Sequence, residues 1–164
     1  MTPVRVGVAR QAARNVIAKC GIKAPPVDVE RVAAGEGLKV MLIDSWSPKV
    51  SGLLLREERL IGINQQHGRR RRRFSLAHEL GHWFMRHDFP WHEEDVTIDN
   101  PPTEEEHRKH PAEGEADEFA GELLAPRVFL KDAMKRTRDP TELADIFDIS
   151  EEALWVRILR HKLL

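Results

Sequence analysis

The sequence lacks residue types on which many functional sites depend. Among its 164 residues it contains one cysteine, Cys20, and no tyrosine. A single cysteine excludes an intrachain disulfide and a zinc site built from several cysteines. Without tyrosine, no phenolic hydroxyl can donate a proton or a hydrogen bond. Any catalytic site in this chain must therefore work without a phenolic hydroxyl and without a zinc ion held by several cysteines.

Charge and hydropathy exclude further classes of protein. The chain has 26 Lys and Arg against 27 Asp and Glu, whereas proteins that hold nucleic acid mainly by charge are usually basic across the domain. No apolar run approaches the length of a membrane span, and the first residues lack the apolar core of a signal peptide. With 41% hydrophobic residues the chain can bury a core. We therefore expect a folded cytoplasmic protein.

The order of helical and strand-like patterns predicts an α+β fold, with helices around a small antiparallel sheet. Strand-like runs cover 38–43, 51–56 and 59–64, and the last two are close enough to pair as a hairpin. Helices are expected over 4–20, after Asp28, from a cap at Ser75, over 112–124 and over 126–135. We expect one main domain over 1–138, in which 88–111 is a flexible acidic insertion. A helix-turn-helix-like appendix over 139–164 follows it.

The stretch HELGH carries a metal-binding pattern. His78 and His82 are four residues apart, which on a helix places both imidazoles on one face, about 40° and one turn apart. Glu79, about 100° around the helix, is placed to reach a metal-bound water and to act as general base. A pattern with three fixed positions also arises by chance, so the hypothesis needs a third ligand.

Two places can supply that ligand. His87 would give HELGHWFMRH, but no glycine redirects the chain and a continuing helix would turn His87 about 180° from His78. The alternative is EGEADEFAGELLAP, where Glu113 and Asp117 fall among the apolar residues of the expected buried face. A buried carboxylate is costly unless a cation meets it. We therefore favour Glu113 as the third ligand.

The same helix supplies two further assignments. Asp117, one turn after Glu113, is expected to orient a ligand histidine from outside the metal's own ligand set. Glu115, Glu118 and Glu122 are expected near the opposite, solvent side. Glu115 is a fallback metal ligand if the helix begins later than the pattern indicates.

The two motifs together resemble the ImmA/IrrE family of HExxH metallopeptidases. RRFSLAHELGHWF followed by EGEADEFAGELLAP has the family pattern, and a strand ending at Asn64 precedes it. The similarity covers most of residues 25–160. It departs at Ala125, where the family usually has Met, and over 88–111, which does not align. The resemblance implies a minimal zincin-like metallopeptidase fold with a short C-terminal helical pair.

The resemblance also implies a function. It assigns His78, His82 and Glu113 as metal ligands and Glu79 as catalytic base. It indicates site-specific endopeptidase activity against a helix-turn-helix repressor or antitoxin, which would relieve repression of a mobile element, toxin or stress response. One Zn²⁺ per chain is expected, although the same ligands accept Mn, Co or Cu. The donor to the oxyanion stays open among an arginine, a backbone N–H and the histidines His87, His92, His107 and His110.

The alternative is a non-catalytic regulator that binds DNA or a repressor. Residues 143–160 resemble a helix-turn-helix, with small Ala144 in the first helix and Ser150 capping the second. The second helix carries two basic residues, Arg157 and Arg160, and begins with acids, which disfavours strong binding in a DNA groove. Direct nucleic-acid binding is therefore not expected. The five arginines over 69–73 are expected to pair with the acidic 88–111 segment, meet an acidic substrate or stay solvated.

Overall fold

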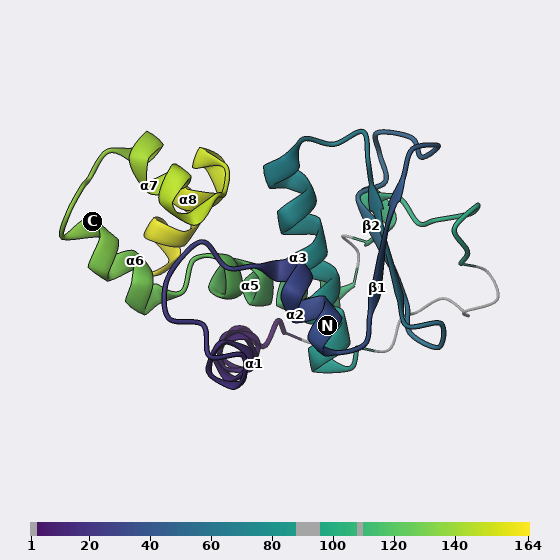
Figure 1. The fold of residues 1–164 in the computed structure, drawn as a ribbon, viewed down its shortest axis with the longest axis horizontal. Helices are drawn as coiled ribbons and strands as arrows, with labels where there is room; N and C mark the ends of the chain where they lie inside the picture. The colour runs from purple at the N-terminus through teal and green to yellow at the C-terminus, as the bar shows by residue number, and fades with distance from the viewer. Residues whose placement is uncertain (1–2, 88–95, 108–109) are drawn as a thin grey trace.

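A computed structural model describes residues 3–87, 96–107 and 110–164. The described residues form eight helices and three strands, and the fold is α+β as the sequence predicts (Figure 1). In chain order the elements are α1 (Val6–Lys19), α2 (Val29–Gly35), β1 (Lys39–Ile43), β2 (Gly52–Leu55), β3 (Leu60–Asn64), α3 (Arg69–Met85), α4 (Glu104–His107), α5 (Pro111–Leu124), α6 (Arg127–Met134), α7 (Pro140–Phe147) and α8 (Glu151–Arg160). Within the described ranges, no helix is both long and apolar enough to cross a membrane.

The three strands form a mixed sheet in the order β1-β3-β2. β2 and β3 pair antiparallel, which confirms the predicted hairpin, and β1 pairs parallel to β3. The hairpin turn contains no glycine; Arg59 instead adopts a left-handed conformation with φ 50°. β3 is the central strand, and Ile61 and Ile63 point into the main core.

The helix α3 lies at the centre of the molecule (Figure 1). It packs against β2 and β3 on one side and against α5 on the other, and α1 covers α5 from beyond. Leu80 of α3 and Phe119 and Leu123 of α5 are completely buried where these elements meet. This packing places the two predicted metal motifs, one on α3 and one on α5, directly against each other.

The start of α3 differs from the prediction. The helix begins at Arg69 after Gly68, which has extended backbone angles, and Ser75 is a buried residue inside the helix rather than its cap. Arginine has high helix propensity, and several of these side chains find acceptors on neighbouring elements. The arginine run therefore forms the first turns of α3 and is not a lead-in to it.

The solvent-facing side predicted for α5 was wrong. Glu115, Glu118 and Glu122 are only 3%, 2% and 1% exposed. A rotation argument assigns one buried face to a helix, but α5 has neighbours on several sides, and arginines from α1 and α8 meet these carboxylates. Asp117, which the same argument placed among buried residues, has a side chain that is 53% exposed.

Candidate metal centre

Three polar side chains converge where α3 crosses α5. His78 Nε2 lies 2.7 Å from one oxygen of Glu113, and His82 Nε2 lies 3.0 Å from the other. The two Nε2 atoms are 3.1 Å apart. One ligand atom from each residue lies within 4.8 Å of the others, and in the described part of the chain this is the group that could hold a metal ion. Two imidazole nitrogens and a carboxylate oxygen are the donor set of many catalytic zinc sites, so the residues present fit zinc.

The electrostatics of this group favour a positive charge at its centre. Burial alone lowers the pKa of His78, but hydrogen bonds with Asp117 and Glu113 outweigh it and raise that pKa well above its ordinary value. Burial lowers the pKa of His82 to about 4. His82 is therefore neutral at physiological pH, which is the form that ligates a metal. Glu113 supplies the negative charge that compensates a cation.

Glu79 lies beside the three candidate ligands. Its side chain is 2% exposed, and it lines a cleft of about 240 Å³ together with His78, Glu113 and Asp117. Gly52, at the start of β2, lines the same cleft, and a Cβ added there would lie 3.1 Å from Glu79 Oε1. The edge of the sheet thus sets the position of the Glu79 carboxylate. Gly52 is a site residue that the sequence reasoning missed, because nothing in the local pattern links it to HELGH.

Asp117 contacts the candidate ligand His78 from the side away from the cluster. Its Oδ1 lies 2.8 Å from His78 Nδ1, which leaves Nε2 of the same ring directed at Glu113. A carboxylate in this position fixes the tautomer and the orientation of a ligand histidine. The contact of Asp117 with His78 is the one expected from the sequence, although Asp117 lies at the surface, and its role at a metal site stays a prediction.

His87 and Glu115 lie outside the three-residue group. The helix α3 ends at Met85, and left-handed Arg86 turns the chain back, so that His87 Nδ1 comes within 2.8 Å of His82 Nδ1. Glu115 lies 2.8 Å from His87 Nε2 and accepts hydrogen bonds from Arg5. His87 therefore contacts the Nδ1 side of His82, Glu115 contacts His87, and neither residue lines the cleft.

The mouth of the cleft is bordered by Arg71 and Glu104. An Arg71 nitrogen lies 2.7 Å from Glu104 Oε1, and the same carboxylate accepts a hydrogen bond from Ser51. The backbone N–H of Glu104 donates to Lys49 O at 2.9 Å, which holds α4 against the β1–β2 connection. Pro102 and Glu104 thus line the cleft, and residues 88–95 of the predicted insertion lie outside the described residues.

The histidines considered as oxyanion donors differ in where they lie relative to the cleft. His110 Nδ1 caps α5 by accepting a hydrogen bond from Ala112 N at 3.1 Å, and His87 is buried behind His82. His92 lies outside the described residues. Arg71 lines the cleft itself and is half exposed, so a guanidinium, paired on one side with Glu104, borders the cleft.

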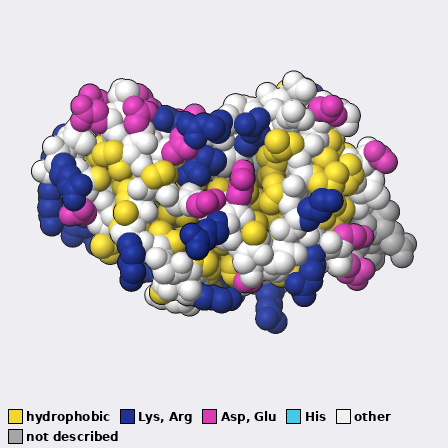
Figure 2. Space-filling view, viewed as in Figure 1, with side chains coloured by type: hydrophobic (Ala, Val, Ile, Leu, Met, Phe, Trp, Pro, Cys, Tyr) yellow, Lys and Arg dark blue, Asp and Glu magenta, His cyan; other side chains and the backbone are white. Residues whose placement is uncertain are grey.

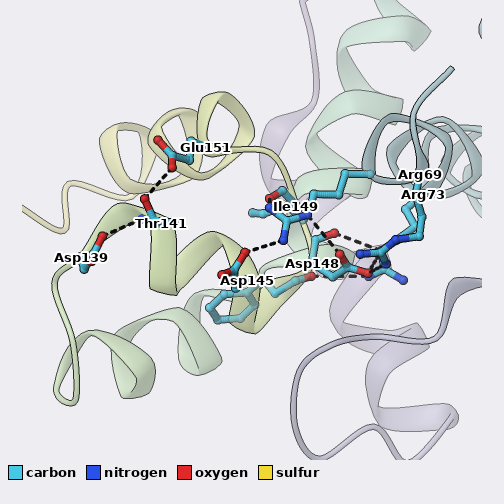
Figure 3. Close-up of polar contacts among 10 residues, drawn as sticks. Arg69, Arg73, Asp139, Thr141, Asp145, Asp148, Ile149 and Glu151 are labelled. Carbon is cyan, nitrogen blue, oxygen red and sulfur yellow. Dashed lines mark hydrogen bonds and ion pairs between the residues drawn. The ribbon is translucent and has the colours of Figure 1, made fainter.

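Three of the other four arginines of the run bind the C-terminal helical pair (Figure 3), whereas Arg72 donates to Gln65 O. Arg69, Arg70 and Arg73 all contact the carboxylate of Asp148 in the turn between α7 and α8. Arg70 also donates to Ile149 O at 3.0 Å and Arg73 to Asp148 O at 3.1 Å. On the face shown in Figure 2, basic side chains are interspersed with acidic and apolar ones. The run therefore serves mostly as an internal contact between α3 and the helical pair.

Comparisons with known proteins agree with this geometry. Residues 33–159 match a peptidase family described as the IrrE N-terminal-like domain. The fold is similar to that of a Mycobacterium tuberculosis transcriptional regulator, with a TM-score of 0.64 and 18% sequence identity. That similarity covers 92% of this chain and 46% of the regulator, so the chain spans about half of its length. No curated protein matches the sequence. Because the family match covers most of the chain and includes both motifs of the site, the chain belongs to the IrrE N-terminal-like peptidase family.

Proposed function

We propose that the protein is a zinc-dependent, site-specific endopeptidase. His78, His82 and Glu113 would hold one zinc ion, and Glu79 would be the catalytic base. The observation that carries the proposal is that His78, His82 and Glu113 converge on one another, while His78, Glu113 and Glu79 line one cleft, in a chain of a peptidase family. Other divalent metals suit the same ligands, so the metal used in the cell is part of what has to be tested.

The residues of the cleft account for the steps of peptide hydrolysis. When bound, zinc supplies the Lewis acidity that makes water a nucleophile near neutral pH. Glu79 is placed to take a proton from a water molecule in the cleft as that water attacks the scissile carbonyl, and then to pass the proton to the leaving amine. Arg71 lines the same cleft and can donate a hydrogen bond to the oxyanion that forms on the carbonyl oxygen.

We further propose that the substrate is a helix-turn-helix repressor or an antitoxin, cut at one site in the cytoplasm. The support is the resemblance of the two motifs to the ImmA/IrrE metallopeptidases. The cleft opens beside α4, the described helix of the acidic connection, so an incoming polypeptide would pass this segment. The test is to incubate the zinc-loaded protein with candidate repressors, beginning with any encoded next to it, and to map cleavage by mass spectrometry.

The substitution Glu79→Gln tests the chemistry directly. It keeps the size of the side chain but removes the base, so we expect cleavage to fall by roughly 10²-fold or more while zinc stays bound. Zinc content by mass spectrometry and cleavage of the same substrate are measured together. Wild-type cleavage by the variant would exclude Glu79 as the base, and loss of zinc would assign it a role in the metal site.

A non-catalytic regulator is the second candidate, because the similar solved structure is named a transcriptional regulator. In this chain α8 is poorly suited to reading DNA. Arg157 is 3% exposed and pairs with Glu122, and Arg160, whose side chain is 51% exposed, contacts Glu118, so both basic residues are engaged in ion pairs within the chain. Near-stoichiometric zinc in the purified protein favours the peptidase, whereas protein that binds a repressor but neither binds zinc nor cleaves favours the regulator.

A further inference from the structure

A chain of polar contacts runs from the candidate metal centre to the N-terminal helix. His82 Nδ1 lies 2.8 Å from His87 Nδ1, and His87 Nε2 lies 2.8 Å from Glu115 Oε1. Arg5, which directly precedes α1, donates to both oxygens of Glu115 through Nε and NH2, each at 2.9 Å, and its backbone N–H donates to Oε2 at 2.9 Å. His82, His87 and Glu115 are at most 8% exposed.

Along the contacts from Arg5 to His82 Nδ1, the donors and acceptors can be assigned in one consistent way when His82 and His87 are neutral. The Nε2 side of His82, 3.0 Å from a Glu113 oxygen, is the side that would face a cation. The Glu115 carboxylate accepts from Arg5, so it is ionised and also accepts from His87 Nε2. A neutral imidazole that donates from Nε2 has a lone pair at Nδ1. Two ring nitrogens at 2.8 Å need one proton between them, so His82 Nδ1 donates that proton to His87. His82 is then left with its lone pair on Nε2, which faces Glu113 and His78.

We propose that Arg5, Glu115 and His87 are positioning residues that hold His82 in the tautomer whose Nε2 can ligate the metal. The inference rests on the proposed zinc site. Arg5 lies outside the family match, which begins at residue 33. Arg5, before the matched region, therefore supports the metal centre through Glu115 and His87. The partner of His82 is a second histidine backed by an ion pair, whereas the partner of His78 is the single carboxylate of Asp117.

The structure offers a matched comparison on the same two helices. Arg14 pairs with Glu122 at 3.1 Å, with side chains that are 47% and 1% exposed, and Arg5 pairs with Glu115 with side chains that are 53% and 4% exposed. Both pairs join the α1 region to α5, but only Glu115 continues to a candidate ligand histidine. An effect on the metal centre that Arg5 has and Arg14 lacks therefore separates positioning from general packing.

The first experiment compares two substitutions of His87 in the full chain. Phenylalanine keeps a ring but no acceptor, whereas the side-chain oxygen of asparagine can stand in for Nδ1. Zinc affinity is measured by competition with a chromogenic chelator. We expect His87→Phe to weaken zinc binding about 10- to 100-fold, the usual effect of removing a partner of a ligand histidine, and His87→Asn to recover most of the loss. Equal affinity in His87→Phe and wild type overturns the inference.

The second experiment uses the pair Arg5→Gln and Arg14→Gln, with thermal unfolding of the metal-free proteins measured alongside. We expect zinc binding to be weaker in Arg5→Gln and unchanged in Arg14→Gln. In ¹⁵N spectra of the metal-free wild type, the ring signals of His82 should show a proton on Nδ1, and these signals should change in Arg5→Gln. Equal losses of zinc affinity in both variants, or an unchanged His82 signal, overturn the inference even if His87→Phe fails to fold. Wild-type protein that binds no zinc contradicts the proposed metal centre, and the ¹⁵N signal still tests the tautomer on its own.

Discussion

Gly52 shows how a single residue can limit the position of a catalytic group. It lies on β2, and its Cα approaches the Glu79 side chain so closely that a methyl group would meet Glu79 Oε1 at 3.1 Å and Cγ at 3.2 Å. The carbonyl oxygen of Gly62 on the neighbouring strand would lie 3.4 Å from the same methyl, so the backbone has little room to move away. A side chain at this position therefore displaces Glu79, and the displacement acts on the proposed base rather than on the metal ligands.

We predict that Gly52→Ala lowers the turnover number for the substrate that the wild type cleaves by roughly tenfold, because small displacements of a reacting group have large effects on rate. Zinc content should stay at the wild-type level, since the side-chain atoms nearest to a Cβ at Gly52 belong to Glu79 and not to a candidate ligand. Kinetics and metal analysis on the same preparation provide the check. Full activity in the variant would mean that Glu79 is not constrained by the sheet edge.

At the scale of elements, the sequence predicted the order and type of nearly every helix and strand described. It also predicted that HELGH and EGEADEFAGELLAP would meet, because paired motifs with ligand spacing impose that contact. The exposure predicted for the glutamates of α5 was wrong. Periodicity along α5 cannot show that Arg10 and Arg14 of α1 will pair with Glu118 and Glu122 and cover them. Nor could local pattern place Asp148, 75 or more residues from the arginines it contacts.

The contact between α3 and the α7–α8 turn gives a prediction at this scale. Asp148 has left-handed backbone angles and a side chain that is 14% exposed among three arginines. Asn tolerates this conformation, so Asp148→Asn removes the charge without straining the turn. We expect the free energy of unfolding to fall by about 1–2 kcal/mol, as for a hydrogen bond to a charged group that is lost. Denaturant unfolding is the measurement.

Asp145→Asn is the matched control, because Asp145 also binds Arg70 but its side chain is 64% exposed. Exposed ion pairs contribute little to stability, so this variant should unfold close to wild type. Equal destabilisation by the two substitutions would contradict the inference that the contacts of Asp148 stabilise the packing of α7 and α8 against α3.

At the scale of the whole molecule, ion pairs connect elements from both ends of the chain around α5. Arg5, Arg10 and Arg14 reach its carboxylates from the N-terminal region, and Arg157 and Arg160 reach them from α8. The carboxylates of these pairs are buried, so removing an arginine partner leaves a desolvated negative charge, which is costly. The same helix carries Glu113, so the network that stabilises the fold also holds one candidate metal ligand in place.

This network makes the stability of the metal-free protein sensitive to acid. Hydrogen bonds from Arg5 lower the pKa of Glu115 to about 2. At Asp148 burial alone would raise the pKa, but the arginines of α3 outweigh it and lower that pKa. A carboxyl group whose pKa is lower in the folded than in the unfolded state binds more protons when unfolded. Its contribution is therefore complete above the unfolded pKa, about 4.3, and is lost as the pH falls through the folded pKa.

We accordingly predict that the denaturant midpoint of the metal-free protein falls as the pH is lowered from about 4.5 to about 2. His82, whose pKa burial lowers to about 4, adds a loss of the same sign as the pH falls below about 6.5, whereas His78, whose pKa is raised, contributes in the opposite sense only above about pH 6.5. The carboxylate window is therefore the clearer test. Glu115→Gln should reduce the slope between pH 4.5 and 2, and an unaltered slope in Glu115→Gln would show that this carboxylate does not couple folding to protons.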